Sequence, residues 1–238
     1  MKNKILTIFA ALLIVAGLLL ISIPYIANMK IEKESQKTVE IVTNEIEPEE
    51  IQDNLGEEPT EGDFDFSAIE DISETGTLLS LDKINRKSII GQIIIPSVDM
   101  NLVLLRGTTN ANLLAGAGTM KPNQKMGEGN YAIAGHYAKR GVLFGDLSNV
   151  KKNAIIRITD KTTIYEYKVY GAKSVSPDRV ELISDLEAEK QGKPILSLMN
   201  CHYVNGKNTG NRYFVFAELV SSYPYTKEKM NSQEENLS

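Results

Sequence analysis

The apolar positions along the chain change their pattern twice, and the first pattern is a long uninterrupted run. Residues 5–27 (ILTIFAALLIVAGLLLISIPYIA) contain no charged side chain. As an α-helix, this run would span about 34 Å, enough to cross the ~30 Å hydrocarbon core of a membrane. A cleaved signal peptide usually has an apolar region of about 7–15 residues and a small-residue cleavage site. We therefore expect an uncleaved membrane anchor at residues 1–28. Its flanking lysines do not decide its orientation.

The second pattern is polar and acidic. Between Thr38 and Asp82 there are 15 acidic residues and no Lys or Arg. Self-repulsion and the scarcity of large apolar side chains favour an extended, solvated chain. Residues 29–82 are therefore predicted to form an acidic stalk. Apolar residues return between Phe64 and Ile84, and this stretch is expected to dock on the following body as a short helix or cap.

The third pattern, from residue 83 onward, consists of short runs rich in β-branched and aromatic residues. Turn signals separate these runs, and helical signals are weak and short, near residues 110–115 and 183–190. About seven or eight short strands in roughly 150 residues predict an all-β body with short helices, either a closed barrel or a sandwich. The body is placed at residues 83–225, followed by a polar tail at 226–238.

Charge and composition narrow the chemistry. The chain carries 26 basic and 31 acidic residues, but from residue 83 onward it carries 21 basic and 14 acidic residues, so the body is mildly basic. One cysteine excludes an internal disulfide framework and any multi-cysteine metal site. Two histidines leave little for a histidine-rich metal centre, and no nucleotide-binding glycine motif occurs. What remains is a cysteine-bearing domain that works without a bound redox cofactor.

Cys201 is the candidate nucleophile. It ends the apolar run PILSLMN beside a polar Asn/Gly-rich loop, where functional groups are often displayed. The alternative is a buried, inert thiol, because free cysteines are among the most buried residues. A reactive cysteine has a reference pKa of ~8.5 and needs a neighbouring base or cation to form its thiolate.

Three side chains could activate or assist Cys201. His202 is adjacent in sequence, but successive strand residues point to opposite faces, so it is poorly placed. His136 ends the apolar run YAIAG and could face Cys201 across the sheet, although such a histidine is often structural. Arg212 opens the run RYFVFAELV after a ten-residue loop and would return to Cys201 if the two strands pair. Its fixed donors suit an oxyanion, whereas a strand-edge surface arginine is the simpler interpretation.

With these residues in this order, the chain resembles the class A sortases, which are membrane-anchored cysteine transpeptidases of Gram-positive bacteria. The similarity covers residues 89–219 as well as the anchor. The strongest matching segments are GQIIIPSVDMNLVLLRGT, ANLLAGAGTMKPNQKMGEGNYAIAGHY, ILSLMNC and RYFVFAEL.

The resemblance implies a closed eight-stranded β-barrel and a division of labour among three residues. Cys201 would be the nucleophile, His136 the general acid/base and Arg212 the stabiliser of substrate and oxyanion. The implied reaction cleaves an LPXTG-type sorting signal between Thr and Gly through a thioester. An amine on the cell-wall precursor lipid II then resolves the thioester.

The resemblance also implies partners and a location. The partners would be secreted surface proteins with C-terminal sorting signals, the lipid II or peptidoglycan cross-bridge amine, and the membrane, with no nucleic acid. The N-terminus would lie in the cytoplasm and the body outside it.

The chain departs from the family pattern in two places. The family reads Thr-Leu-x-Thr-Cys before and at the nucleophile, whereas this chain has Ser197 and Asn200 at the two threonine positions. Asn200 borders the substrate groove and makes the preferred sorting motif uncertain; Leu113 falls where the family often has an apolar groove residue. The loop MKPNQKMGEGN has one carboxylate, Glu128, where some members bind Ca²⁺, so neither a metal site nor calcium stimulation is expected.

Other functions remain open at this stage. A pilin-polymerising or otherwise specialised sortase would use a different motif or amine acceptor, but neither a lid nor a C-terminal membrane span is evident. A membrane-tethered β-barrel binding module would carry Cys201 only as a structural residue. A papain-like protease is a weaker alternative, because that family's local cysteine signature is missing.

Overall fold

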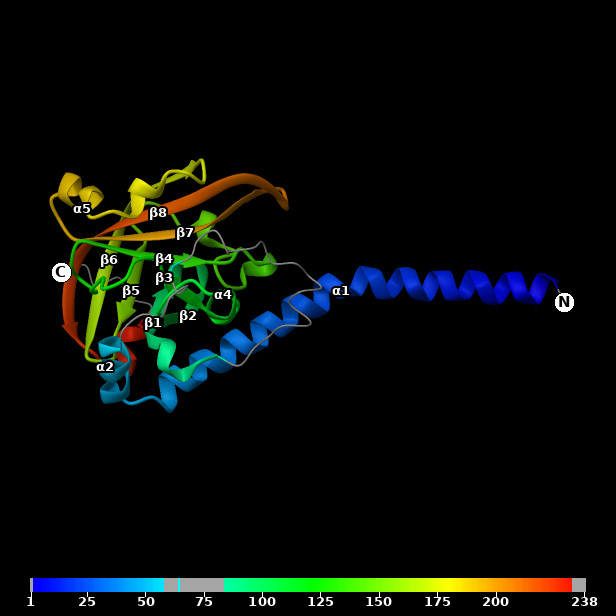
Figure 1. Ribbon diagram of the computed structural model, residues 1–238, viewed down its shortest axis with the longest axis horizontal. Helices are drawn as coiled ribbons and strands as arrows, with labels where there is room; N and C mark the ends of the chain where they lie inside the picture. Colours follow the sequence, from blue (N-terminus) through cyan, green and yellow to red (C-terminus); the bar gives the residue numbers. More distant parts are fainter. Residues whose placement is uncertain (1, 58–63, 65–83, 233–238) are drawn as a thin grey trace.

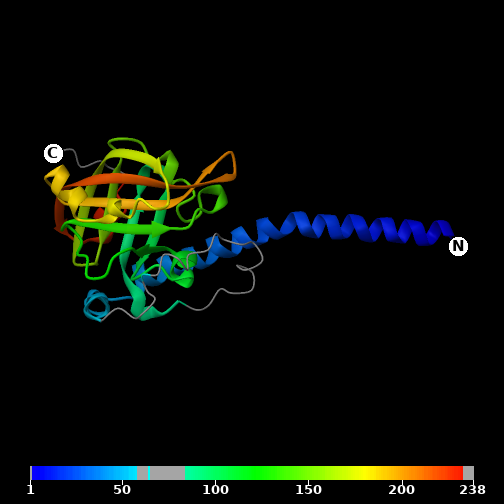
Figure 2. The same ribbon diagram turned by 45° about the horizontal axis from the view of Figure 1, so that its top comes forward.

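The structure is a computed structural model that describes residues 2–57, 64 and 84–232, and it combines one long helix with a β-barrel (Figure 1). Helix α1 (Lys2–Asn44) projects from the barrel at its N-terminal end and lies against the barrel in its second half. Helix α2 (Pro48–Gly56) follows it. Figure 2 shows the same separation from a second direction.

Eight strands close into a barrel in the order β1-β2-β3-β4-β7-β8-β6-β5. The β2/β3 and β4/β7 pairs are parallel, and the other pairs are antiparallel. The strands are β1 (Ile89–Ile95), β2 (Met100–Leu105), β3 (Ala117–Thr119), β4 (Asn130–Gly135), β5 (Ile155–Thr159), β6 (Thr163–Val175), β7 (Ile195–Val204) and β8 (Lys207–Pro224). The prediction of an eight-stranded, all-β barrel is confirmed.

Short helices connect or flank the strands, as expected. They are α4 (Asn110–Ala115), α5 (Leu186–Gln191), α6 (Lys227–Met230) and 3₁₀ turns at Arg86–Ser88, Pro96–Val98, Lys139–Gly141, Leu147–Asn149 and Val180–Ile183. Helix α6 lies in the predicted polar tail, yet Met230 is fully buried beside Ile94 and Ile164. The start of this tail therefore packs on the barrel.

The barrel core follows from the β-branched and aliphatic runs. All seven residues of β1 are buried, because one face points into the barrel while the other is covered by helices and loops. The main core cluster joins side chains from all eight strands, including Ala117 of β3, to those of the 138–150 segment. This packing fixes the ends of β4 and β7, at which the candidate site lies.

Strands β7 and β8 form a longer hairpin than the sequence suggested. The ten-residue loop expected after Cys201 is wrong, because both strands continue to a two-residue turn at Asn205 and Gly206. Both turn residues have positive φ, 51° and 74°, as the type I′ hairpin favoured by Asn-Gly requires. A bulge between Cys201 and Tyr203 absorbs the extra residues of β8.

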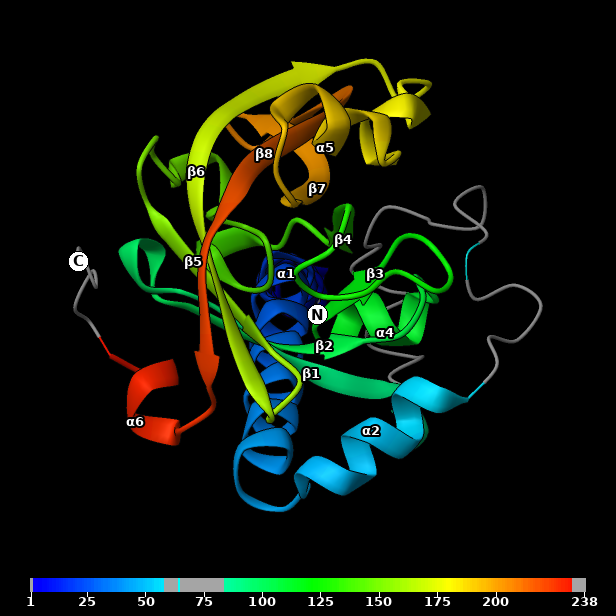
Figure 3. The same ribbon diagram turned by 90° about the vertical axis from the view of Figure 1, so that its left-hand side faces the viewer.

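The extended, solvated stalk predicted from residue 29 is also wrong for residues 29–56. Helix α1 continues through this region, and its buried residues Ile31, Ser35, Thr38 and Val42 recur at helical spacing. Helix α2 buries Ile51 completely and lies beside β1 (Figure 3). Most of the segment expected to form a cap, between Phe64 and Ile84, lies outside the described residues.

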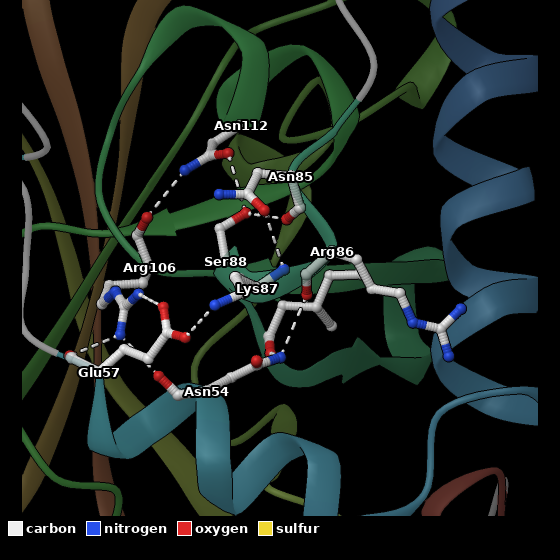
Figure 4. A network of polar contacts seen from close by, with 9 residues as sticks. Asn54, Glu57, Asn85, Arg86, Lys87, Ser88, Arg106 and Asn112 are labelled. Atoms are coloured by element: carbon white, nitrogen blue, oxygen red, sulfur yellow. Dashed lines mark hydrogen bonds and ion pairs between the residues drawn. The ribbon is translucent and has the colours of Figure 1, made fainter.

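Acidic residues in α2 and just after it pair with basic residues of the body, so the expected self-repulsion is offset. Figure 4 shows the pair formed by Glu57 and Lys87. Glu50 accepts from Arg86 Nε at 2.6 Å, and Glu57 accepts from Lys87 Nζ at 2.7 Å. The hydrogen bond from Arg86 lowers the pKa of Glu50, and the one from Lys87 lowers the pKa of Glu57. Exposed pairs of this kind contribute little individually, so the buried apolar face supplies most of the docking energy.

A lysine in the turn between β5 and β6 binds the C-terminal end of α1. Lys161 Nζ donates to the carbonyl oxygens of Val42 and Ile46 at 2.8 and 2.5 Å. Burial lowers the pKa of Lys161. An ammonium group at a helix C-terminus also complements the negative end of the helix dipole.

We predict that Asn54→Ala destabilises the protein by about 1–3 kcal/mol, because it leaves buried carbonyl groups without their donor. The Asn54 side chain is buried and donates to Arg86 O at 3.1 Å and Ile89 O at 2.8 Å. Unfolding of the full chain in detergent measures the effect. Asp53→Ala, at an exposed position of the same helix, should cost less than about 0.5 kcal/mol. Equal losses would contradict this account.

Candidate active site

Strand pairing brings the three predicted catalytic side chains to one end of the barrel. Strands β4 and β7 run parallel with Ala134 paired to Met199, so His136 and Cys201 follow these partners at the same distance along the chain. Strands β7 and β8 are antiparallel with Cys201 directly opposite Arg212. Two ladders thus align residues that lie 65 and 11 positions apart in the sequence.

All three residues line one pocket of about 250 Å³. Its other walls are mainly apolar: Leu113, Met120, Ala134, Gly135, Pro177, Val180, Ile183, Met199 and Phe214, together with Asn200 and Arg179. Leu113 and Asn200, both expected at a substrate groove, therefore line the same pocket as Cys201. A largely apolar pocket with a few converging polar groups is typical of ligand-binding sites.

Cys201 is half-buried, whereas His136 has only 3% of its surface exposed. The His136 Nε2 atom lies 3.2 Å from Oδ1 of Asn110, the first residue of α4. A neutral imidazole that donates from Nε2 to this oxygen keeps Nδ1 as its acceptor. Asn110 thus orients the ring of His136, a role that sequence reasoning missed because Asn110 lies 26 residues upstream.

The segment after His136 is fastened to the strand that carries Cys201. The Phe144 amide donates to His136 O at 3.0 Å, and Asn200 Nδ2 donates to Phe144 O at 2.7 Å. A side chain at Gly135 would overlap the Phe144 ring, with contacts near 2.5 Å, so this close packing requires glycine. The backbone of Phe144 therefore hydrogen-bonds both His136 and Asn200, the residue before Cys201.

Asn200 is a buried structural amide as well as a pocket residue. It is 3% exposed, and its Oδ1 atom is buried without a hydrogen-bond partner in the described residues. A threonine at this position has a shorter side chain with a single hydroxyl, so it could not reproduce the same amide geometry. The departure at Asn200 is thus coupled to the local path of the 137–144 segment.

Stacked tyrosines add a second link between the two strand ends. The rings of Tyr137 and Tyr203 are 4.0 Å apart at their centroids and inclined by 9°. Tyr137 follows His136, and Tyr203 lies two residues after Cys201. Ring stacking of this kind contributes about 0.5–1.5 kcal/mol beyond the burial of area.

The connection between β6 and β7 supplies a wall that sequence reasoning did not anticipate. Pro177, Arg179, Val180 and Ile183 line the pocket, so a second arginine borders it besides Arg212. Arg179 pairs with Glu181, and this hydrogen bond raises the pKa of Arg179 and lowers that of Glu181. The exposed Val180, with 67% of its surface accessible beside a pocket, is consistent with a contact surface for a bound ligand.

His202 does not join the pocket-lining residues. Its Nδ1 atom lies 2.8 Å from Ser174 Oγ, and its ring packs on Tyr213 with centroids 5.3 Å apart. This arrangement agrees with the expectation that neighbouring strand residues point to opposite faces.

The loop before β4 is fixed by an ion pair. Lys121 Nζ lies 2.8 Å from Asp185 Oδ1, which also accepts from the Asn130 amide at 2.9 Å. The hydrogen bond from Lys121 is the main cause of a lowered pKa for Asp185. Among the described residues, no group of three or more His, Cys, Asp or Glu side chains could hold a metal ion.

Comparison with known proteins finds a consistent set of relatives. A sortase domain model matches residues 93–220. Sortase A of Bacillus anthracis is 39% identical over 93% of this chain and 97% of its own length, and Sortase A of Listeria monocytogenes is 33% identical over 93% and 95%. The solved structure of Listeria monocytogenes sortase A superposes with a TM-score of 0.54 and 37% identity, covering 60% of this chain and 95% of that one.

We predict that His136→Ala abolishes cleavage of a sorting-signal peptide, whereas His202→Ala retains most of the activity. The first substitution removes the pocket imidazole, and the second removes a ring held by Ser174 and Tyr213. Cleavage is followed by chromatography of the peptide. Equal losses in the two variants would overturn the assignment of the acid/base group.

Proposed function

The chain belongs to the sortase family and is a class A cysteine transpeptidase, and from this we propose which residues and substrates carry the reaction. Cys201 acts as the nucleophile on an LPXTG-type sorting signal, between its Thr and Gly. His136 acts as the general acid/base, and Arg212 stabilises the substrate and the oxyanion. The pairing of Cys201 with Arg212, in a pocket shared with His136, is the observation that supports these roles most directly.

The first half of the reaction forms a thioester. The Cys201 thiol passes its proton to His136, and the resulting thiolate attacks the Thr carbonyl carbon, so that the carbonyl oxygen takes up the negative charge beside the Arg212 guanidinium. When the tetrahedral intermediate collapses, the C–N bond breaks and His136 donates a proton to the departing Gly amine. The mainly apolar pocket walls suit the Leu and Pro side chains of such a signal.

The second half transfers the protein to an amine. An incoming amine attacks the thioester carbonyl, His136 accepts its proton, and the Cys201 thiolate leaves. We propose the lipid II cross-bridge amine as the acceptor. The surface proteins that carry sorting signals are the donors.

The apolar first half of α1 is consistent with a single-pass membrane anchor. Within the described residues, α1 is the one helix long and apolar enough to cross a membrane, and the most apolar 18-residue window of this helix has no buried residue. We propose that the N-terminus is cytoplasmic and the barrel lies outside. This orientation would bring the pocket to the side on which secreted proteins and lipid II meet.

A polymerising or specialised sortase remains the alternative within the same family. It would resolve the same thioester with a protein lysine, or it would accept a different motif. Asn200, in the position of a family threonine, is the feature that favours an altered motif preference. A binding module without catalysis would make Cys201 dispensable.

We predict that the full chain in nanodiscs joins an LPXTG peptide to triglycine and forms a thioester adduct on Cys201. Mass spectrometry detects both products. Cys201→Ala should abolish them, with activity falling by at least about 10³-fold, because the nucleophile is removed. Retained transfer in this variant would exclude the thioester mechanism, and transfer to lysine rather than glycine amines would favour the polymerising alternative.

We also predict that millimolar Ca²⁺ leaves this activity unchanged and that EDTA does not lower it. Calcium requires several clustered oxygen ligands, whereas the loop before β4 carries Lys121 and Lys125 with Glu128 as its carboxylate. Initial rates with and without Ca²⁺ test this. A several-fold increase that EDTA reverses would contradict the prediction.

A further inference from the structure

The barrel begins where the apolar run of α1 ends. Ile26 is half-exposed, Ala27 is buried, and Asn28 Nδ2 donates to Lys139 O at 2.7 Å. The Arg140 guanidinium lies over the Tyr25 ring, 5.3 Å from its centroid. The first barrel segment that α1 meets is therefore the one that follows His136.

This contact determines the depth of the barrel relative to a bilayer. A helix rises 1.5 Å per residue, so Asn28 lies about 3 Å beyond Ile26. The headgroup region extends about 5–8 Å beyond the hydrocarbon core on each side. If the apolar run spans the core, the 137–141 segment lies at headgroup depth.

The turn of the β7–β8 hairpin lies at the same level. Gly206 lines a crevice of about 170 Å³ together with Pro24, Asn28, Tyr137, Lys139 and Tyr203, among others. Figures 1 and 2 show this end of β7 and β8 directed toward the N-terminal part of α1. Two segments, 137–141 and 203–207, thus border the anchor; we refer to them as the membrane-proximal rim.

The rim has the composition of a membrane-contacting surface. Lys139, Arg140 and Lys207 are exposed, as is Val204, while residues 136–145 and 200–213 contain no Asp or Glu. Tyrosines at positions 25, 137 and 203 add aromatic rings, which are enriched at membrane interfaces. The acids Glu32, Asp99 and Asp146 line a neighbouring crevice that also includes Arg140 and Gly141, whereas Lys139 and Lys207 do not line it.

We propose that the membrane-proximal rim docks on anionic phospholipid headgroups, with Lys139 and Lys207 contacting their phosphates. Basic residues next to a membrane are attracted to its anionic lipids, and this attraction is screened by salt. The crevice beside α1 offers space for a headgroup between the anchor and the stacked tyrosines. The inference rests on the membrane anchoring given under the proposed function.

Docking would hold the active site close to the bilayer. Tyr137 follows His136 directly, and Tyr203 lies two residues after Cys201. The rim is thus continuous with the pocket in sequence and in space. A lipid-linked amine acceptor would then reach the thioester on Cys201 at the membrane surface.

Hydrogen exchange of the full chain in nanodiscs tests the docking. One set of discs contains neutral phosphatidylcholine, and the other also contains anionic phosphatidylglycerol. Amides in residues 137–141 and 203–207 should exchange several-fold more slowly in the anionic discs. The double variant Lys139→Gln/Lys207→Gln should lose this difference, and added salt should reduce it.

A matched control removes two positive charges from the opposite end of the barrel. Lys190→Gln/Lys193→Gln alters exposed lysines on and just after α5 (Figure 1) and should keep the lipid-dependent difference. Equal exchange of the unsubstituted chain in both lipids, or an equal loss in the two double variants, would overturn the proposal. Slower exchange in neutral discs on addition of inorganic phosphate alone would show binding of free phosphate instead.

The outcome is separable from that of the proposed function. Cleavage of a short soluble peptide is measured in the same nanodiscs. Lipid-dependent protection without cleavage would contradict the proposed chemistry only, whereas cleavage without protection would contradict the docking only.

Discussion

The parallel ladder between β4 and β7 is the constraint on which the site depends. It sets the ends of two buried strands level, so that His136 and Cys201 emerge at the same edge of the barrel. The antiparallel ladder between β7 and β8 then brings Arg212 opposite Cys201. A slip of one residue in either ladder would turn the affected side chains to the opposite face and separate the three groups. The buried apolar residues of these strands therefore bring the three pocket residues together by fixing the register.

Much of the acidic segment before the barrel is helical and packs on the body. Net charge favoured an extended stalk, but Ile31, Val42 and Ile51 supply an apolar face that the body can bury. Because the body is basic, Arg86 and Lys87 complement the acids that remain on the surface. Because α1 is one continuous helix and its second half packs on the barrel, the apolar segment connects to the barrel without a flexible linker. The distance between the apolar segment and the barrel is therefore set by packing rather than by linker length.

Sequence reasoning reached the barrel and the three pocket residues for physical reasons. Short β-branched runs predict strands, and the order of His136, Cys201 and Arg212 within long matching segments carried the family resemblance. The helical form of residues 29–56 was missed because charge density describes a segment alone, whereas its stability comes from long-range contacts such as Asn54 with Ile89. Arg179, from the β6–β7 connection, and Asn110, the first residue of the short helix α4, were missed because distant parts of the chain deliver them, with no local periodicity to reveal them.

The 137–144 segment contacts both helix α1 and the strand that carries Cys201. At one end it contacts α1 through the bond from Asn28 to Lys139 O; at the other, Phe144 bonds His136 through its amide and Asn200 through its carbonyl. Movement of the anchor relative to the barrel would therefore strain the same segment that orients the pocket imidazole. Because Asn200 precedes Cys201 on β7, the amide that departs from the family pattern is also the contact that joins this segment to the strand carrying Cys201. A change at position 200 would therefore alter the contact with Phe144, whose amide donates to the carbonyl of His136.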